Sequence, residues 1–284
     1  MKDRTVIITG ANAGIGKATA FKIAEMEANV ILVCRNIKKG EQTLKEIQES
    51  TNNNNLDLMI CDFSSLKSIK SFVSNFKEKY DKLDVLINNH GAFFLRKQLT
   101  EDGVESTFAV NHLGYFSLTL QMLESLKAGT KPRIVNVSSS SNYRIKEWEL
   151  DDYNWDNRKY NMMKAYAESK LYNILFTFLL AKKLKETNIT ANCLHPGYIK
   201  TNIGLNSPFL RLLRPLVKIK AMPLEEGAKT SVYLATSKKA EGATGKFYSK
   251  MEEKEPNKIA FNKEKQMELW DLSLKLTGLN RIDT

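Results

Sequence analysis

The 284-residue sequence predicts a single-domain α/β protein, a doubly wound parallel sheet of about seven strands with helices on both faces. Short β-rich apolar runs alternate along the chain with longer segments of helical spacing. The runs also lack the polar alternation of half-exposed strands, as expected when helices cover both faces. Such alternation with right-handed crossovers gives a doubly wound sheet. The expected strands are Thr5–Thr9, Val30–Cys34, Leu56–Cys61, Val85–Asn88, Arg133–Ser138 and Thr190–His195, and the expected helices are Ile15–Met26, Lys38–Glu49, Leu66–Tyr80, Val104–Leu126 and Met163–Glu186.

The composition is that of a globular protein, with 42% hydrophobic and 26% charged residues, which excludes wholesale disorder and a disulfide scaffold. The formal charge of +11 favours anionic partners such as phosphorylated cofactors, anionic membranes or nucleic acid. The lysines are scattered through expected helices, and we find no nucleic-acid motif. We therefore expect a solvated basic surface and no nucleic-acid partner.

The three cysteines, Cys34, Cys61 and Cys193, end or interrupt apolar runs and form no CxxC pair. This pattern predicts buried thiols in a reducing compartment and no metal site. The first expected strand begins too early to leave room for a signal peptide, and no apolar stretch approaches the roughly 20 residues of a spanning helix. We expect a cytoplasmic protein, unless a peripheral contact attaches it to a membrane.

The first expected strand runs directly into a glycine-rich turn, TGANAGIG at 9–16, and then into a helix. Glycines allow a tight turn that brings backbone N–H groups close to a diphosphate, and the positive end of the following helix favours its charge. Glycine in a turn is commonly only a turn residue, but this strand–turn–helix context indicates a Rossmann-type dinucleotide site. The candidate residues are Gly10, Asn12, Ala13, Gly14, Ile15 and Gly16.

The end of the second expected strand indicates which dinucleotide binds. An acidic residue there would hydrogen-bond the ribose hydroxyls of NAD, but the sequence has Arg35 followed by Asn36. An arginine pairs with a 2′-phosphate through its planar fork of donors, and Lys17 supplies a second cation. These residues predict NADP(H). The alternative is that Arg35 and Lys17 are solvated surface cations.

Polar residues also follow the third and fourth expected strands. Asp62 is a candidate acceptor for the adenine amino group, with Phe63 beside it, and Asn89 lies in the segment NNHG at 88–91. We expect these residues to line the cofactor site. The alternative is that they are turn residues.

The segment YAESK at 166–170 lies near the start of a long expected helix, where a spacing of four places Tyr166 and Lys170 on one face. A free tyrosine titrates at about 10 and is a poor proton donor or base at neutral pH, whereas a neighbouring ammonium lowers its pKa. Ser139, at the end of the fifth expected strand, is a candidate to hydrogen-bond a substrate oxygen that gains charge. Physical reasoning alone does not separate it from Ser138.

Together and in this order, the motifs closely resemble the short-chain dehydrogenase/reductase family over nearly the whole chain. They are TGANAGIG at 9–16, NNHG at 88–91, VNHLG with Asn111, NVSS at 136–139, YAESK at 166–170 and HPGYIKT at 195–201. The resemblance implies a catalytic tetrad of Asn111, Ser139, Tyr166 and Lys170.

In that tetrad Tyr166 is the general acid or base and Ser139 positions the substrate oxygen. Lys170 holds the nicotinamide ribose and tunes Tyr166, so both also count as cofactor-binding residues, and Asn111 anchors a relay water. Pro196, Gly197 and Thr201 match the family's segment beside the nicotinamide.

Within the family, VILVCRN, the long spacing from Ser139 to Tyr166 and LHPGYIKT look like the retinol dehydrogenase-like branch. The branch implies an NADP(H)-dependent oxidoreductase that interconverts a carbonyl and an alcohol on a lipophilic retinoid-like, fatty-aldehyde or steroid-like substrate. Members of that branch often carry an amino-terminal membrane anchor, and we expect none here. His90 stands where the family usually has alanine, and we expect His90 to pack. The alternative function is a catalytically weak NADP(H)-binding sensor or interaction protein.

These assignments divide the domain, residues 1–284, into a nucleotide-binding half (about 1–130), a catalytic half with a substrate lid (about 131–250) and a tail (about 251–284). The apolar and basic stretch 208–222 is expected to be the lid, with core packing and peripheral membrane contact as alternatives. The aromatic excursion 142–161 either lines the pocket entrance or is pinned down by its rings. The helices expected at 104–126 and 163–186 are candidates for pairing in a homodimer.

Overall fold

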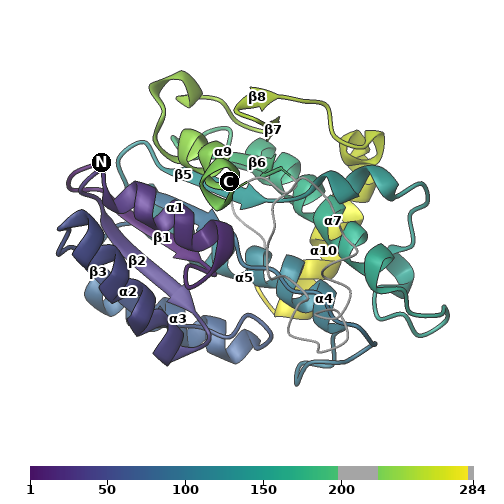
Figure 1. The fold of residues 1–284 in the computed structure, drawn as a ribbon. Coiled ribbons are helices and arrows are strands. Elements are labelled where there is room, and N and C mark those ends of the chain that lie inside the picture. Colours follow the sequence, from purple (N-terminus) through teal and green to yellow (C-terminus); the bar gives the residue numbers. More distant parts are fainter. Residues whose placement is uncertain (198–222, 281–284) are drawn as a thin grey trace.

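The computed structural model describes residues 1–197 and 223–280, and its centre is one eight-stranded sheet (Figure 1). The strands are β1 (Thr5–Thr9), β2 (Asn29–Cys34), β3 (Leu56–Ile60), β4 (Val85–Asn88), β5 (Arg133–Val137), β6 (Thr190–His195), β7 (Phe247–Ser249) and β8 (Glu252–Glu253). Their order is β3-β2-β1-β4-β5-β6-β7-β8, and all pairs are parallel except β7 with β8. The predicted doubly wound parallel sheet is confirmed.

The sheet has eight strands rather than about seven. β7 and β8 form a hairpin whose two connecting residues, Lys250 and Met251, have φ of 53° and 64°. Two residues of positive φ match the twist of antiparallel strands. Because β8 is an exposed pair of glutamates, it carries no apolar signal in the sequence. The predicted strand ranges otherwise differ by one residue at an end, which is within the usual uncertainty of such boundaries.

Helices cover both faces of the sheet and enclose apolar cores (Figure 1). They are α1 (Gly14–Ala24), α2 (Ile37–Thr51), α3 (Leu66–Lys79), α4 (Ser106–Phe108), α5 (Gly114–Gln121), α6 (Leu123–Lys127), α7 (Met162–Lys183), α9 (Leu224–Thr236) and α10 (Lys263–Thr277). One face carries α1, α2 and α9, and the other carries α3, α5 and α7. In the described ranges, no helix combines the length and the apolar character that a membrane crossing needs.

The long helix expected at 104–126 is interrupted. Between α4 and α5 the chain forms a π-helical turn, η1 (Ala109–Leu113), which contains Asn111. Such turns occur frequently at functional sites. Here the Val110 carbonyl lies 2.9 Å from Nε2 of His90, and the Asn111 side chain binds Ala92. These contacts with the loop after β4 come from distant sequence, so helical periodicity did not reveal the interruption.

The C-terminal segment packs against the domain through α10. Trp270 is 2% exposed and contacts Phe116 of α5 at 5.0 Å and Phe176 of α7 at 6.0 Å between ring centroids. Lys182 donates to Gln266 at 2.9 Å. The surfaces of α5 and α7 under α10 are therefore covered by the chain itself and are not available to a second subunit.

His112 is the buried polar residue at this contact. Its Nε2 lies 2.9 Å from the Ser273 hydroxyl of α10, and aromatic rings surround it. Burial lowers its pKa to about 3. The folded protein therefore keeps His112 neutral under conditions in which the unfolded chain, with a pKa of about 6.5, takes up a proton.

This difference predicts acid sensitivity. As the pH falls from about 6.5 towards about 3, protonation of His112 in the unfolded chain should lower the free energy of unfolding by about 1.4 kcal/mol per pH unit. Above about pH 6.5, His112 should make no contribution to the pH dependence. We expect His112→Gln to lower stability at pH 7 but to flatten the slope between pH 6 and pH 4 by about that amount. Urea unfolding followed by circular dichroism at several pH values measures it. Equal slopes in both proteins would contradict the prediction.

Candidate active site

The glycine-rich turn joins β1 to α1 in a conformation that leaves room for a diphosphate. Gly14 has a φ of 55°, and a Cβ built there would meet nothing within 4 Å. A Cβ on Gly16 would lie 2.3 Å from the Gly10 carbonyl oxygen and 2.4 Å from the Asn89 amide nitrogen, so only glycine fits. Ala13, before the helix, has no side-chain cap, which leaves first-turn N–H groups for a ligand. The turn therefore fits a dinucleotide.

Two residues after β4 hold the start of this turn. Asn89 donates to the Thr9 carbonyl through its amide at 2.9 Å and to the Thr9 hydroxyl through its backbone at 2.8 Å. His90 is buried and uses both ring nitrogens, one 2.9 Å from the Thr9 hydroxyl and the other 2.9 Å from the Val110 carbonyl. Its ring also stacks on Phe63 at 3.6 Å. His90 thus packs as expected and, in addition, hydrogen-bonds the turn to η1.

At the end of β2, Arg35 is largely exposed, and its guanidinium lies 3.8 Å from the Asp62 carboxylate after β3. The other Asp62 oxygen accepts from the Ser64 backbone at 2.9 Å, so Asp62 also shapes its own turn. Asn36 caps α2 by accepting from the Lys39 backbone at 3.0 Å.

Lys17, expected as a second cation for the cofactor, instead forms an ion pair with Glu46 of α2. That carboxylate reduces the positive charge that Lys17 presents. Arg35 is therefore the more accessible of the two predicted cations.

The catalytic candidates converge at the carboxyl end of β5. Tyr166 and Lys170 lie on one face of α7, and the Lys170 ammonium is 5.7 Å from the Tyr166 ring centroid. Ser139 follows β5, and its hydroxyl lies near enough to the Tyr166 phenol to lower the pKa of that phenol. The same hydroxyl lies 3.2 Å from the Ser141 hydroxyl. Ser138 is buried, and its hydroxyl donates to the Lys170 carbonyl at 2.6 Å. The structure therefore favours Ser139 over Ser138 as the hydroxyl that meets a substrate.

The electrostatics of the pair differ from expectation. Burial raises the pKa of Tyr166 to about 12, and the nearby Ser139 hydroxyl acts in the opposite direction. Burial also lowers the pKa of Lys170 to about 7. The Lys170 ammonium donates to the Val137 carbonyl at 3.0 Å rather than to the phenol. In this structure the group that favours the Tyr166 phenolate is therefore Ser139 and not Lys170.

Asn111 is fully buried beside these groups. Its side-chain oxygen accepts from the Ala92 backbone at 2.7 Å, and its nitrogen donates to the Ala92 carbonyl at 3.0 Å and the Ser169 hydroxyl at 3.1 Å. A Cβ built on Gly91 would lie 3.5 Å from both the Asn111 oxygen and the Lys170 nitrogen. The four candidate catalytic residues are thus brought together, although their roles stay predictions.

The remaining candidates lie at the end of β6. Pro196 and Gly197 directly follow the strand, and Gly197 has a φ of 96°. Thr201 and the expected lid at 208–222 lie outside the described residues. A cavity of about 450 Å³ opens at the carboxyl ends of β6 and β7, lined in part by Tyr143, His195 and Phe247. Across residues 1–197 and 223–280, no three metal-ligating side chains form a cluster.

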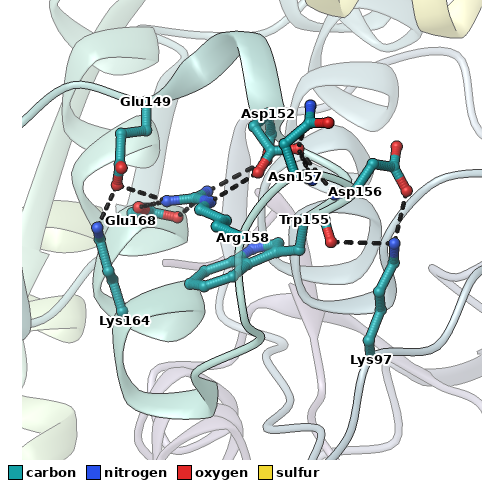
Figure 2. Close-up of polar contacts among 9 residues, drawn as sticks. All are labelled: Lys97, Glu149, Asp152, Trp155, Asp156, Asn157, Arg158, Lys164 and Glu168. Carbon is teal, nitrogen blue, oxygen red and sulfur yellow. Dashed lines mark hydrogen bonds and ion pairs between the residues drawn. The ribbon is translucent and has the colours of Figure 1, made fainter.

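The excursion 142–161 is pinned to α7 by a buried ionic cluster that the sequence did not indicate (Figure 2). Arg158 binds the Glu168 carboxylate with both terminal nitrogens, at 2.8 and 3.0 Å, and also pairs with Glu149 and Asp152. Its guanidinium lies 3.7 Å from the buried ring of Trp155. Of the two expected roles for this stretch, anchoring is therefore the observed one for Trp155.

The fold and these residues define a dinucleotide-dependent oxidoreductase of Rossmann type. Residues 4–149 match the sequence model of the short chain dehydrogenase family. Human retinol dehydrogenase 13 is 38% identical over 97% of this chain and 85% of its own length, and mouse retinol dehydrogenase 14 is 38% identical over 98% and 87%. The crystal structure of an uncharacterized protein from Mycobacterium paratuberculosis aligns with a TM-score of 0.80 at 30% identity, covering 98% of this chain and 95% of that one.

The chain therefore belongs to the short-chain dehydrogenase/reductase family, in its retinol dehydrogenase-like branch. Enzymes of this family bind a nicotinamide cofactor and interconvert an alcohol and a carbonyl.

The ionic cluster yields a stability prediction. Arg158→Met leaves the Glu168 carboxylate buried and unpaired, and should destabilise the protein by about 3–5 kcal/mol. Adding Glu168→Met should recover much of that loss, because the uncompensated charge is gone. Lys22→Met, in the exposed pair with Glu25, is the control and should cost less than about 1 kcal/mol. Chemical unfolding decides: a double variant no more stable than Arg158→Met would count against this account.

Proposed function

We propose that the protein is an NADP(H)-dependent oxidoreductase that interconverts a lipophilic aldehyde or ketone and its alcohol. The observation that carries the proposal is the convergence of Ser139, Tyr166 and Lys170 at the sheet edge that also holds the glycine turn. A proton donor, a hydrogen-bond donor for the substrate oxygen and a dinucleotide cradle are the parts that such a reaction requires.

The preference for NADP(H) rests on Arg35. It stands at the end of β2, where an acidic residue would bind the ribose hydroxyls of NAD, and it is 73% exposed. Its guanidinium forms an ion pair with Asp62 at 3.8 Å, which is too long for a hydrogen bond, so its N–H donors remain available for bidentate hydrogen bonds with a 2′-phosphate.

The nicotinamide supplies or accepts the hydride when it is bound. In the direction of reduction, Tyr166 donates its proton to the substrate oxygen, and Ser139 hydrogen-bonds the same oxygen. With a pKa of about 12, Tyr166 holds that proton throughout the neutral range and is available as a donor. Lys170 is buried beside the phenol, where its ammonium donates to the Val137 carbonyl. An ammonium has three N–H donors, so another is available for a hydroxyl of the nicotinamide ribose.

We infer a small lipophilic, retinoid-like substrate from the family branch, since the chain is 38% identical to human retinol dehydrogenase 13. The cavity at the ends of β6 and β7 does not carry this inference, because its lining includes Lys250, Glu252 and Lys254 and none of the catalytic candidates.

Removal of the proton donor tests the proposal. Tyr166→Phe should lower kcat for NADPH-dependent aldehyde reduction by about 10²-fold or more, because the proton donor is lost, while the folded protein still binds NADPH. Loss of NADPH absorbance across a panel of lipophilic aldehydes measures the rate. Tyr80→Phe is the control and should keep full activity, because the Tyr80 hydroxyl donates to Asp57 near the start of β3. NADPH binding without turnover in the wild-type protein would instead support the sensor alternative.

The cofactor assignment has its own test. Arg35→Ala should raise the Kd for NADPH by about tenfold or more, through loss of a charge-assisted bidentate pair, and should leave the Kd for NADH nearly unchanged. Lys45→Ala, at an exposed position on α2, is the matched control. Fluorescence titration of the reduced cofactors gives both constants, and equal losses for the two cofactors would refute an interaction with the 2′-phosphate.

A further inference from the structure

The loop after β4 carries an aromatic side chain that the proposed mechanism does not use. Phe93 stacks on Tyr166, with ring centroids 3.8 Å apart and planes 19° from parallel. Both side chains are partly exposed, so the stacked pair forms part of the site's surface. Phe93 covers one face of the phenol ring, and the Tyr166 hydroxyl lies on the side of Ser139.

Phe93 is held in place through the backbone on either side of it. The Asn111 amide binds Ala92 in both directions, at 2.7 and 3.0 Å. On the other side, the Tyr160 hydroxyl donates to the Phe94 carbonyl at 3.0 Å. Because both neighbouring peptide groups are anchored, the fold rather than a substrate sets the position of the Phe93 ring.

Tyr160, which holds the Phe94 carbonyl, is in turn linked to α7 through a series of side-chain contacts. Glu168 of α7 binds Arg158, whose guanidinium covers the Trp155 ring (Figure 2). Trp155 meets the Tyr160 ring edge-on, with centroids 5.2 Å apart. The excursion thereby fixes the loop relative to the same helix that presents the phenol.

This arrangement restricts the substrate atoms beside the reacting carbonyl. A substrate oxygen must come within about 2.6–3.2 Å of the Tyr166 hydroxyl for proton transfer. The carbons next to it then pass along the edge of the Phe93–Tyr166 stack. A flat conjugated group gains from offset or edge contacts with such rings, whereas a saturated, tetrahedral carbon makes poorer contact with a flat surface.

We propose that Phe93 is a specificity-determining residue, and that it selects carbonyls and alcohols whose adjoining carbons are planar and conjugated. The inference rests on the proposed function, because it assumes that substrates react at Tyr166. It assigns the selection to one side chain and therefore predicts that a single substitution removes it.

The test compares cinnamaldehyde with 3-phenylpropanal, which share a carbon skeleton and differ by one conjugated double bond. The wild-type ratio of kcat/KM for the two aldehydes should fall by about two- to tenfold in Phe93→Leu, the range expected for loss of one aromatic contact. Phe93→Tyr keeps a flat ring and should keep the ratio. Phe94→Leu, in the same loop, is the matched control and should also keep it. Intrinsic reactivity cancels because only ratios are compared among variants.

An unchanged ratio in Phe93→Leu, or an equal fall in Phe94→Leu, would overturn the inference while leaving the proposed function intact. If the wild-type protein reduces neither of these aldehydes but reduces others of the lipophilic panel, the proposed function stands and binding tests Phe93. If it reduces no aldehyde of the panel, the proposed function fails and the inference fails with it. Cinnamamide and 3-phenylpropanamide present the same skeletons without reacting, and calorimetry with NADP⁺ bound gives their affinities. Tighter binding of cinnamamide that is lost in Phe93→Leu supports the inference, and equal affinities in the wild-type protein overturn it.

Discussion

Two hydrogen bonds between β5 and α7 hold the groups on which the rest of the site depends. The Ser138 hydroxyl donates to the Lys170 carbonyl, and the Lys170 ammonium donates to the Val137 carbonyl. These bonds dock the helix on the end of the strand, so that Ser139 and Tyr166 meet at one edge. Because β4 lies between β5 and β1, the same edge also carries the glycine turn. Parallel topology thus places the cofactor cradle and the proton donor side by side.

The same docking buries Lys170, whereas Ser139 and Tyr166 stay partly exposed at the edge of the sheet. Desolvation raises the pKa of Tyr166 and lowers that of Lys170, so the phenol keeps its proton at neutral pH and the amine loses its proton more readily than a free lysine does. The neighbouring polar groups are held by specific partners, as Asn111 is by Ala92 and His90 is by Thr9 and Val110. A buried site of this kind keeps its geometry because unmade hydrogen bonds are costly in a low dielectric.

Sequence reasoning succeeded where the signal was local. The β-α alternation, the glycine turn and the spacing of Tyr166 and Lys170 are each readable within a few residues, and the described fold agrees with them. Sequence reasoning was incomplete where a contact between distant segments determines the local structure or the partner of a side chain. The π-turn around Asn111 and the ion pair of Lys17 with Glu46 both depend on segments that periodicity does not connect. The contacts of Arg158 with Glu149 and Glu168 likewise join residues whose pairing no sequence pattern indicated.

The sequence by itself therefore determined the class of fold and the residue types available for chemistry, because backbone propensity and apolar spacing are properties of short segments. The tertiary structure decided which serine faces the phenol, which cation stays exposed and that Phe93 lies against Tyr166. Those outcomes require side chains far apart in the chain to compete for the same partners and the same space, and only packing in three dimensions resolves that competition.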